Sequence, residues 1–264
     1  MKKHLYLFCI LNLFSYLTVV LVNGLAVVLP LNNRSTGALS DSYPNLFVPA
    51  GITFSIWGVI YLMLLSFCIY QIVMLVGKRG NKSVILDIGM FFFLSSIFNV
   101  AWIFAWHYER ILLSFVIMLL LLFSLIVLYL RLDVGKKSVS NGVRFFINAP
   151  ISVYLGWISI ATIANATALL VDAGWSGGGI SPVVWTISML GAGTLLSILI
   201  LHLRGDMFYS AVVVWAFAGI IIKRSGIDLP SSQPVIIASY AGITIIILFT
   251  IFTILRNRFC KVSI

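Results

Sequence analysis

The sequence predicts an all-α fold, a polytopic transmembrane helix bundle with eight predicted spans, and three observations support this class. The chain is 61% hydrophobic and 9% charged, with a mean hydropathy of +1.13, whereas soluble domains carry about 25% charged residues. The apolar residues form continuous runs of about 20, long enough to cross a hydrocarbon core of roughly 30 Å. Basic residues gather between these runs. Continuous rather than alternating apolar runs exclude a membrane β-barrel.

The apolar runs are bounded by charges, glycines and prolines. The first follows Lys2 and Lys3, and we expect a retained helix rather than a signal peptide because the run is long and lacks a small-x-small cleavage site. A polar connection over 30–51 precedes the second run, and loops with basic residues follow the second, fourth and sixth. The predicted spans are 5–29, 52–76, 84–106, 111–130, 145–171, 182–203, 207–222 and 234–255.

The connections before the last three spans differ in amino-acid composition from the earlier connections. Residues 173–181 form a glycine-rich turn without a basic residue, and Pro182 suits the first position of a helix. The triplet 204–206, Arg-Gly-Asp, predicts a tight turn. We therefore predict two parts, a five-helix transmembrane core over 1–172 and three additional helices with a basic tail over 173–264.

Charge asymmetry predicts the orientation of the bundle. With eight spans, both termini and the loops after spans two, four and six share one side, which holds most of the 17 Lys and Arg residues. The positive-inside rule places that side, with both termini, in the cytoplasm, and we expect a bacterial cytoplasmic membrane. Only Arg34, Arg110, Lys223 and Arg224 lie on the other side, and the adjacent pair at 223 and 224 is the awkward exception.

Composition also excludes several classes of function. The net charge of +10 comes from loops, where it serves topology, so we predict no nucleic-acid partner. The three cysteines and three histidines are scattered without metal-ligand spacing, so no metal site is predicted. No span centre carries an acid or a base, which argues against an ion-coupled transporter. We recognise no catalytic motif, so the sequence predicts no enzyme and no catalytic residue.

Aromatic side chains mark the second span. Phe54, Trp57 and Tyr61 are separated by three and four residues and therefore share one helical face. They follow a Pro/Gly loop that ends near Pro49. This arrangement predicts the mouth and wall of a pocket for a flat ligand, although Trp and Tyr at a membrane interface followed by a simple turn give the same pattern.

Amides and aromatic residues also mark the third and fifth spans. Asn99 and Trp102 share a face of the third span because they are three residues apart. Taken singly, such features are also typical of helix packing, in which amides join neighbouring helices. One stripe of the fifth span is aromatic at one end, small in the middle and amide at the other, and it consists of Tyr154, Trp157, Ala161 and Asn165.

Three motifs in this order resemble one known family. The first runs over 44–61, the second is Asn99-x-x-Trp102, and the third is Pro150-x-x-x-Tyr154-x-x-Trp157-x-Ser159-x-Ala161-Thr162-x-x-Asn165. Together they resemble the TspO/translocator protein family (TspO/MBR), also called tryptophan-rich sensory proteins. The resemblance covers about 5–171, which would be the five helices typical of that family.

The resemblance implies a ligand cavity that faces the loop between the first two spans. That loop, 30–51, would act as a lid, and Trp57 and Trp157 would face each other across the cavity. Family members bind porphyrins and other tetrapyrroles, so a haem-like tetrapyrrole is the implied ligand. The implied ligand-binding residues are Pro49, Phe54, Trp57, Tyr61, Asn99, Trp102, Tyr154, Trp157, Ala161 and Asn165.

Two departures from the family pattern qualify this expectation. Phe54 precedes Trp57 by three residues where the family usually has four, which predicts a rotated start of the second span and a Phe54 turned away from the cavity. The last three spans have no counterpart in the five-helix members. The additional helices would close the flank of the cavity, form a dimer surface or extend the function.

The sequence thus predicts an integral membrane binding protein, a receptor-like sensor or carrier. Its ligand would be a flat hydrophobic molecule of the porphyrin class, held between aromatic residues of spans two, three and five. No cofactor is required, the bilayer and the ligand are the expected partners, and a homodimer is compatible with the sequence. The alternatives are a transporter of a small uncharged or amphipathic metabolite, light-dependent porphyrin breakdown as in some relatives, and a structural subunit without a ligand.

Overall fold

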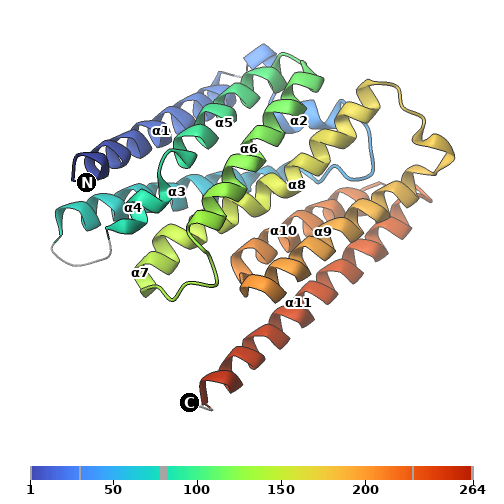
Figure 1. Ribbon diagram of the computed structural model, residues 1–264. Coiled ribbons are helices and arrows are strands. Elements are labelled where there is room, and N and C mark those ends of the chain that lie inside the picture. Colours follow the sequence, from blue (N-terminus) through green and yellow to red (C-terminus); the bar gives the residue numbers. More distant parts are fainter. Residues whose placement is uncertain (1, 30, 78–81, 228, 263–264) are drawn as a thin grey trace.

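The fold is a bundle of helices with no strand in the part of the chain that the structure describes (Figure 1). The structure is a computed structural model, and it describes residues 2–29, 31–77, 82–227 and 229–262. The predicted fold class is therefore confirmed. The long helices are α1 Lys2–Val28, α3 Ile56–Val76, α5 Phe91–His107, α6 Ile111–Arg131, α8 Ala149–Asp172, α9 Pro182–Arg204, α10 Met207–Ser225 and α11 Ser232–Val262.

Short helices fill the connections and the helix ends. Within the described residues, seven helical segments are long and apolar enough to cross a membrane, and α5 is a shorter apolar helix of 17 residues. Because α4 leads directly into α5, these segments account for all eight predicted spans. The short helices are η1 Leu31–Asn33, α2 Thr36–Asp41, η2 Gly51–Ser55, α4 Ser83–Ile88, α7 Asn141–Val143, η3 Arg144–Asn148 and η4 Gly177–Gly179.

The third predicted span is interrupted, which the apolar pattern alone did not indicate. The helix α4 ends at Ile88, and Gly89 adopts a φ of 54° before α5 begins at Phe91. Glycine adopts positive φ without the steric cost that a Cβ imposes. A side chain of Arg131 covers this break, since its guanidinium donates to the carbonyl oxygens of Asp87 and Leu86 at 2.8 and 3.1 Å.

The helix α8 lies at the centre of the bundle. It packs against α3 and α6 on one side and against α10 on the other, while α9, α10 and α11 lie together as a further group (Figure 1). Gly156 of α8 allows the close approach of α10, because a Cβ there would lie 3.0 Å from the Tyr209 carbonyl oxygen. The predicted boundary at 172 falls at the end of α8, yet α10 packs directly on that helix.

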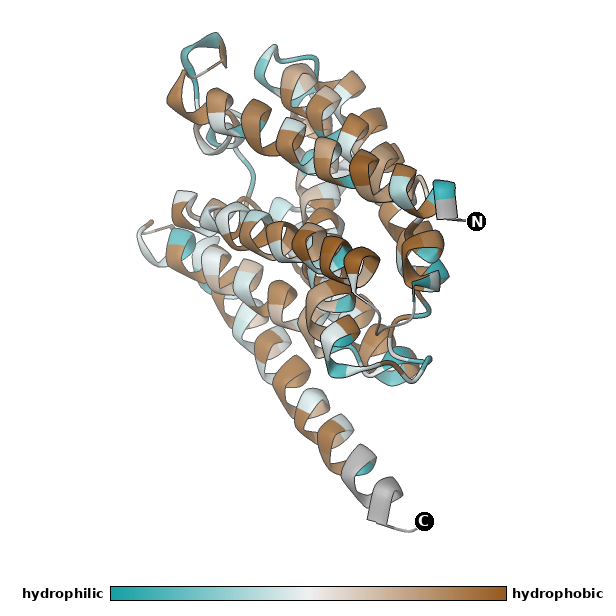
Figure 2. Ribbon diagram, turned by 90° about the vertical axis from the view of Figure 1, so that its left-hand side faces the viewer, coloured by the Kyte–Doolittle hydropathy of each residue, from teal (hydrophilic) through white to brown (hydrophobic). Residues whose placement is uncertain are grey.

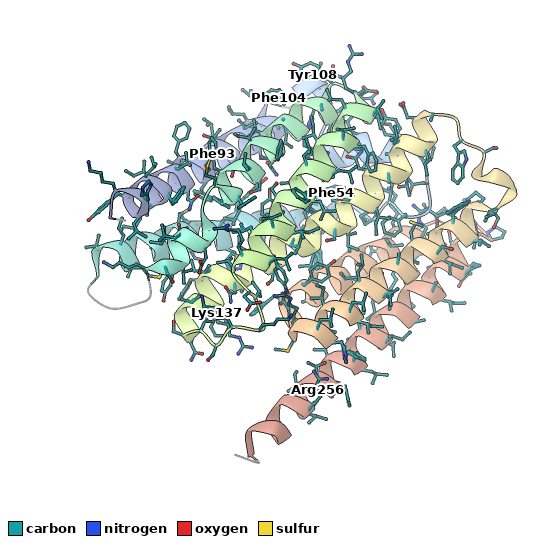
Figure 3. All side chains as sticks on the ribbon, viewed as in Figure 1. Phe54, Phe93, Phe104, Tyr108, Lys137 and Arg256 are labelled. Carbon is teal, nitrogen blue, oxygen red and sulfur yellow. The ribbon has the colours of Figure 1, made fainter. Side chains whose placement is uncertain are left out.

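The outer surface is that of a membrane protein. Figure 2 shows hydrophobic residues along the lengths of the helices, with hydrophilic residues concentrated in the connections and at the helix ends. Large apolar side chains such as Phe14, Leu62 and Ile237 are more than half exposed, which suits contact with lipid rather than water. The side chains of Phe93 and Phe104 also lie along α5 (Figure 3), and Phe104 is 43% exposed.

Candidate ligand-binding site

Trp57 on α3 is the centre of a cluster of aromatic rings. Its ring stacks on Tyr61 with the centroids 5.7 Å apart. It also makes edge contacts with Tyr154 at 6.0 Å and with Trp157 at 6.2 Å, both from α8. Offset and edge-to-face contacts at these separations are the favourable arrangements for aromatic pairs. The resemblance implies that Trp57 and Trp157 face each other across a cavity, and in the structure their rings make a direct edge contact.

Phe54 belongs to the same cluster, although the shorter spacing predicts that it is turned away. Its ring lies edge-on to Trp157, with the centroids 5.9 Å apart and the planes at 84°. The reason is that Phe54 lies in η2, a 3₁₀-helix that leads into α3. A 3₁₀-helix has three residues per turn, so a spacing of three keeps two side chains on one face. The expected rotation of Phe54 is therefore wrong.

The amides of the site are bonded to other helices. The buried Asn99 side chain accepts a hydrogen bond from Asn23 Nδ2 at 2.8 Å and donates one to Tyr154 Oη at 3.0 Å. Trp102 Nε1 donates to Asn165 Oδ1 at 2.9 Å. These bonds join α1, α5 and α8, so the amides serve helix packing.

A small cavity of about 40 Å³ lies among these rings, and we call it the aromatic cavity. Most of the residues predicted for the site line it, whereas Tyr61, Asn99 and Tyr154 lie outside the lining and support Trp57 and each other. The predicted residues in the lining are Pro49, Phe54, Trp57, Trp102, Trp157, Ala161 and Asn165.

Other lining residues were not predicted from the sequence. Trp106 follows Trp102 by one helical turn, and that spacing was a usable signal. Ala216 and Ile220 come from α10, where no polar or aromatic pattern marks them. The connection between α1 and η2 also contributes lining residues, and these are Thr36, Ser40 and Phe47.

The connection between α1 and η2 closes the aromatic cavity, and we call its residues 34–50 the lid. Within the lid, the Phe47 side chain is buried. On the α5 side, Trp106 Nε1 donates to the Thr36 carbonyl oxygen at 3.3 Å, and the Tyr43 ring lies 6.0 Å from Trp106. Burial, with a smaller contribution from the Glu109 carboxylate, raises the pKa of Tyr43 above its ordinary value, so the phenol stays neutral at physiological pH.

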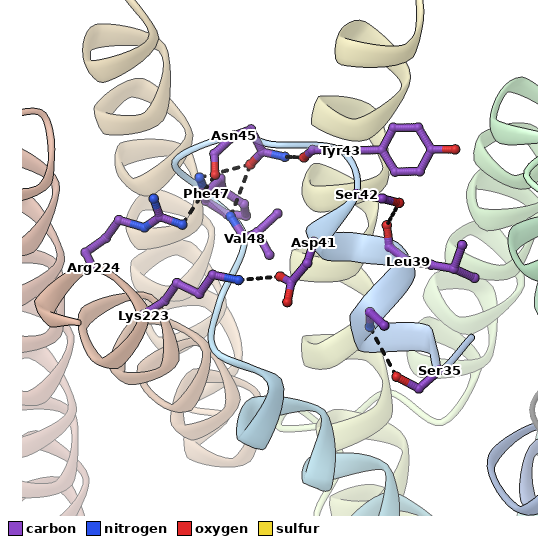
Figure 4. A network of polar contacts seen from close by, with 11 residues as sticks. Ser35, Leu39, Asp41, Ser42, Tyr43, Asn45, Phe47, Val48, Lys223 and Arg224 are labelled. Carbon is purple, nitrogen blue, oxygen red and sulfur yellow. Dashed lines mark hydrogen bonds and ion pairs between the residues drawn. The ribbon is translucent and has the colours of Figure 1, made fainter. Parts of the chain in front are cut away.

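On its other side the lid is attached to α10 (Figure 4). Lys223 forms an ion pair with Asp41, and Arg224 Nη2 donates to the Asn45 carbonyl oxygen at 3.5 Å. The Asn45 side chain in turn accepts the backbone N–H groups of 47 and 48, which fixes the turn of the lid. The basic pair that is an exception in the charge pattern therefore holds the lid.

Backbone contacts reinforce this attachment at the end of the lid. The Ala50 N–H donates to the Gly219 carbonyl oxygen at 2.9 Å, and Trp215 Nε1 donates to the Thr53 carbonyl oxygen at 2.9 Å. A side chain at Gly219 would collide with Thr53, so this glycine permits the contact between α10 and η2.

One polar atom at the aromatic cavity has no partner. Trp157 is 3% exposed, and its Nε1–H donates to no acceptor in the described part of the chain. A buried N–H without an acceptor costs about 1–3 kcal/mol. Among the described residues no group of three or more His, Cys, Asp or Glu side chains could hold a metal ion. The site is therefore apolar and aromatic, with one free donor.

Fold and site together define a polytopic helical membrane protein whose aromatic cavity is closed by the loop between its first two spans. Residues 9–252 match the family model of the TSPO-like proteins. This chain belongs to that family. The match is wider than the region 5–171 that the motifs indicate, because it continues through α9 and α10 and into α11. No curated protein and no solved structure matches the chain.

Proposed function

We propose that this protein binds a flat hydrophobic ligand of the tetrapyrrole class between α3, α5 and α8, as a sensor or carrier in the membrane. The observation that carries the proposal is the convergence of Phe54, Trp57 and Trp157 on one cavity, with a free indole N–H in its wall. A carboxylate or carbonyl oxygen of the ligand would accept the hydrogen bond that Trp157 lacks.

The energetics of such a ligand suit the lining. Burying apolar surface contributes roughly 25 cal/mol per Å², and each offset or edge contact between aromatic systems adds about 0.5–1.5 kcal/mol. Ala161 and Ala164 leave room beside the rings because they carry only a methyl group. A mostly apolar lining with a few polar groups is the usual composition of a small-molecule pocket.

The lid must move for a ligand of this size to enter. The aromatic cavity measures about 40 Å³, whereas pockets for drug-sized ligands measure about 300–1,000 Å³. A neighbouring apolar cavity of about 360 Å³ lies on the other side of the lid, lined by Leu46, Leu170, Trp175 and Trp185. Since residues 44–46 line one cavity and 47 and 49 the other, a shift of this segment would join the two spaces.

The test is a titration of the purified protein with protoporphyrin IX, followed by the absorbance of the porphyrin itself. We expect Trp57→Ala and Trp157→Ala each to weaken binding at least several-fold, because each removes a ring that stacks on the ligand. The matched control is Phe104→Ala, which removes an aromatic ring from the outer face of α5, where Phe104 is 43% exposed (Figure 3). Unchanged affinity in both tryptophan variants would refute the proposed pocket.

A further inference from the structure

A second, polar cavity lies at the opposite end of the bundle from the lid. It measures about 440 Å³ and lies between the connection 134–141, the beginning of the fifth span and the turn between α9 and α10. Figure 3 shows Lys137 at this end, far from Tyr108 at the end of α5. We call this cavity the basic cleft. It shares no residue with the aromatic cavity.

The lining of the basic cleft has an excess of positive charge. Four cations line it, namely Lys136, Lys137, Arg144 and Arg204, against the single carboxylate of Asp206. That carboxylate is already engaged, because it accepts the N–H groups that begin α10 and the Tyr129 hydroxyl at 3.0 Å.

Two of the cations have acidic partners and two do not. Arg204 Nη1 lies 3.1 Å from Asp133 Oδ1, and Lys137 Nζ lies 3.5 Å from Asp87 Oδ2. Lys136 and Arg144 have no ion-pair partner among the described residues. The cleft therefore offers cations that an anion could bind without breaking an existing pair.

The floor of the cleft holds two buried polar atoms without partners. Asn148 is 6% exposed and Ser152 is 0% exposed, and both line the cleft. Neither Asn148 Oδ1 nor Ser152 Oγ has a hydrogen-bond partner within the described residues. They are four residues apart, so they lie on the same face of the helix. Buried polar groups are normally hydrogen-bonded. Two unpaired groups in one cleft therefore indicate a partner that the described part of the protein does not supply.

The local backbone is also unusual. Residues Arg144–Asn148 form a π-helical turn, in which the Ala149 N–H donates to the Arg144 carbonyl oxygen five residues before it. Single π-turns within helices are rare and are found frequently at functional sites. This turn carries a cation of the cleft, Arg144, at its start and the unpaired amide, Asn148, at its end.

We propose that the basic cleft binds a phosphate-bearing polyol, the chemistry shared by glycerophospholipid headgroups and soluble glycerol or sugar phosphates. The phosphate would lie against Arg144 and Lys136, because charge-assisted hydrogen bonds to phosphate are strong. A ligand hydroxyl would donate to Asn148 Oδ1 and accept from the Ser152 hydroxyl. An anion without a hydroxyl group, such as chloride or sulfate, has no donor for the Asn148 oxygen.

The test uses the full chain in nanodiscs. In one arm, nanodiscs of phosphatidylcholine are titrated with glycerol phosphate by calorimetry. In the other, nanodiscs that also contain phosphatidylglycerol are analysed by native mass spectrometry for retained lipid. Saturable binding of glycerol phosphate identifies a soluble ligand, and retention of one phosphatidylglycerol identifies a headgroup. Absence of both overturns the proposal.

Two variants distinguish binding in the basic cleft from general electrostatic attraction of the ligand to a basic protein. We expect Arg144→Gln to weaken binding about tenfold, because it removes a charge-assisted bond to the phosphate. The control Arg256→Gln removes the same charge from α11, outside the cleft (Figure 3), and is expected to leave binding unchanged. Equal losses in the two variants would overturn the proposal.

Ser152→Ala supplies a readout that a purely structural serine would not give. Because Ser152 Oγ has no partner within the described residues, its removal is expected to leave the melting temperature unchanged or raise it. The same variant is expected to weaken the ligand about fivefold, which corresponds to one lost hydrogen bond. A lower melting temperature with unchanged affinity would show that the hydroxyl serves only the fold.

Discussion

At the scale of single residues, two of the buried tryptophans that line the aromatic cavity, Trp102 and Trp157, differ in the hydrogen bonding of their indole N–H groups. Trp102 donates to Asn165, whereas Trp157 has no acceptor within the described residues. Sequence spacing placed both residues on the correct faces, because faces follow from the helical period. Spacing did not identify which indole is bonded, since the partner of each comes from another helix and depends on tertiary packing.

The comparison of Trp102→Phe with Trp157→Phe tests this difference. Both changes remove the same atoms from buried positions, so their packing losses are similar. Trp102→Phe also takes a donor from the buried Asn165 oxygen, so it is expected to lower the free energy of unfolding by about 1 kcal/mol more than Trp157→Phe. Denaturation followed by circular dichroism measures this, and equal losses would show that the Trp157 indole has a partner after all.

Asn99 shows how much the sequence can predict about a polar residue within a membrane span. The sequence predicts that such an amide needs a partner, and the structure supplies two, Asn23 and Tyr154. Because both of its polar groups are used within the protein, Asn99 holds Tyr154 in place behind Trp57 rather than facing the cavity. The sequence could not distinguish a partner on another helix from a ligand.

At the scale of elements, the limits of some helices were predictable. Prolines, glycines and charges mark the ends of α9 and α10, and the structure begins both helices at the predicted residues, Pro182 and Met207. The break at Gly89 and the 3₁₀ turn η2 were not predicted, because an apolar sequence is compatible with a continuous helix. The contact of α10 with the lid depends on tertiary packing and left no local pattern.

Gly219 permits the close contact between α10 and η2 at the end of the lid. We expect Gly219→Ala to lower the free energy of unfolding by about 1–3 kcal/mol, because its added methyl group collides with Thr53. Gly191→Ala on α9 is the matched control, since no atom lies within 4 Å of its added Cβ. It is expected to be neutral or to stabilise by up to about 1 kcal/mol through helix propensity. Similar melting temperatures for the two variants would contradict the close approach.

The ion pair between Asp41 and Lys223 is expected to slow ligand entry by holding the lid on α10. Partly exposed pairs contribute about 0.2–1 kcal/mol, so Asp41→Lys is expected to accelerate porphyrin association about threefold in stopped-flow measurements. The exchanged variant, Asp41→Lys with Lys223→Asp, restores the opposite charges and is expected to restore the slower rate. Asp172→Asn, which removes an exposed acid outside the pair, serves as the control. If the exchanged variant associates as fast as Asp41→Lys, the pair does not govern the lid.

At the scale of the whole molecule, the charge pattern and the lid support one topology. Four cations line the basic cleft at one end of the bundle, and the pair Lys223 and Arg224 lies at the other end, where it contacts the lid. These contacts with the lid give the pair a structural role, so its position does not argue against the orientation that the other cations predict. From the positive-inside rule we expect the basic cleft on the cytoplasmic side and the lid on the opposite side.

Single-cysteine labelling tests this orientation. Arg34→Cys at the lid is expected to react with a membrane-impermeant maleimide in intact cells, whereas Lys137→Cys at the basic cleft is expected to react only after permeabilisation. Both sites are exposed in the structure, and Cys9 and Cys68 are buried. Replacing Cys260 by Ser in both variants leaves one reactive position in each. The reverse pattern would place the lid in the cytoplasm, so that a ligand would reach the aromatic cavity from inside the cell and the phosphate-bearing ligand of the basic cleft from outside.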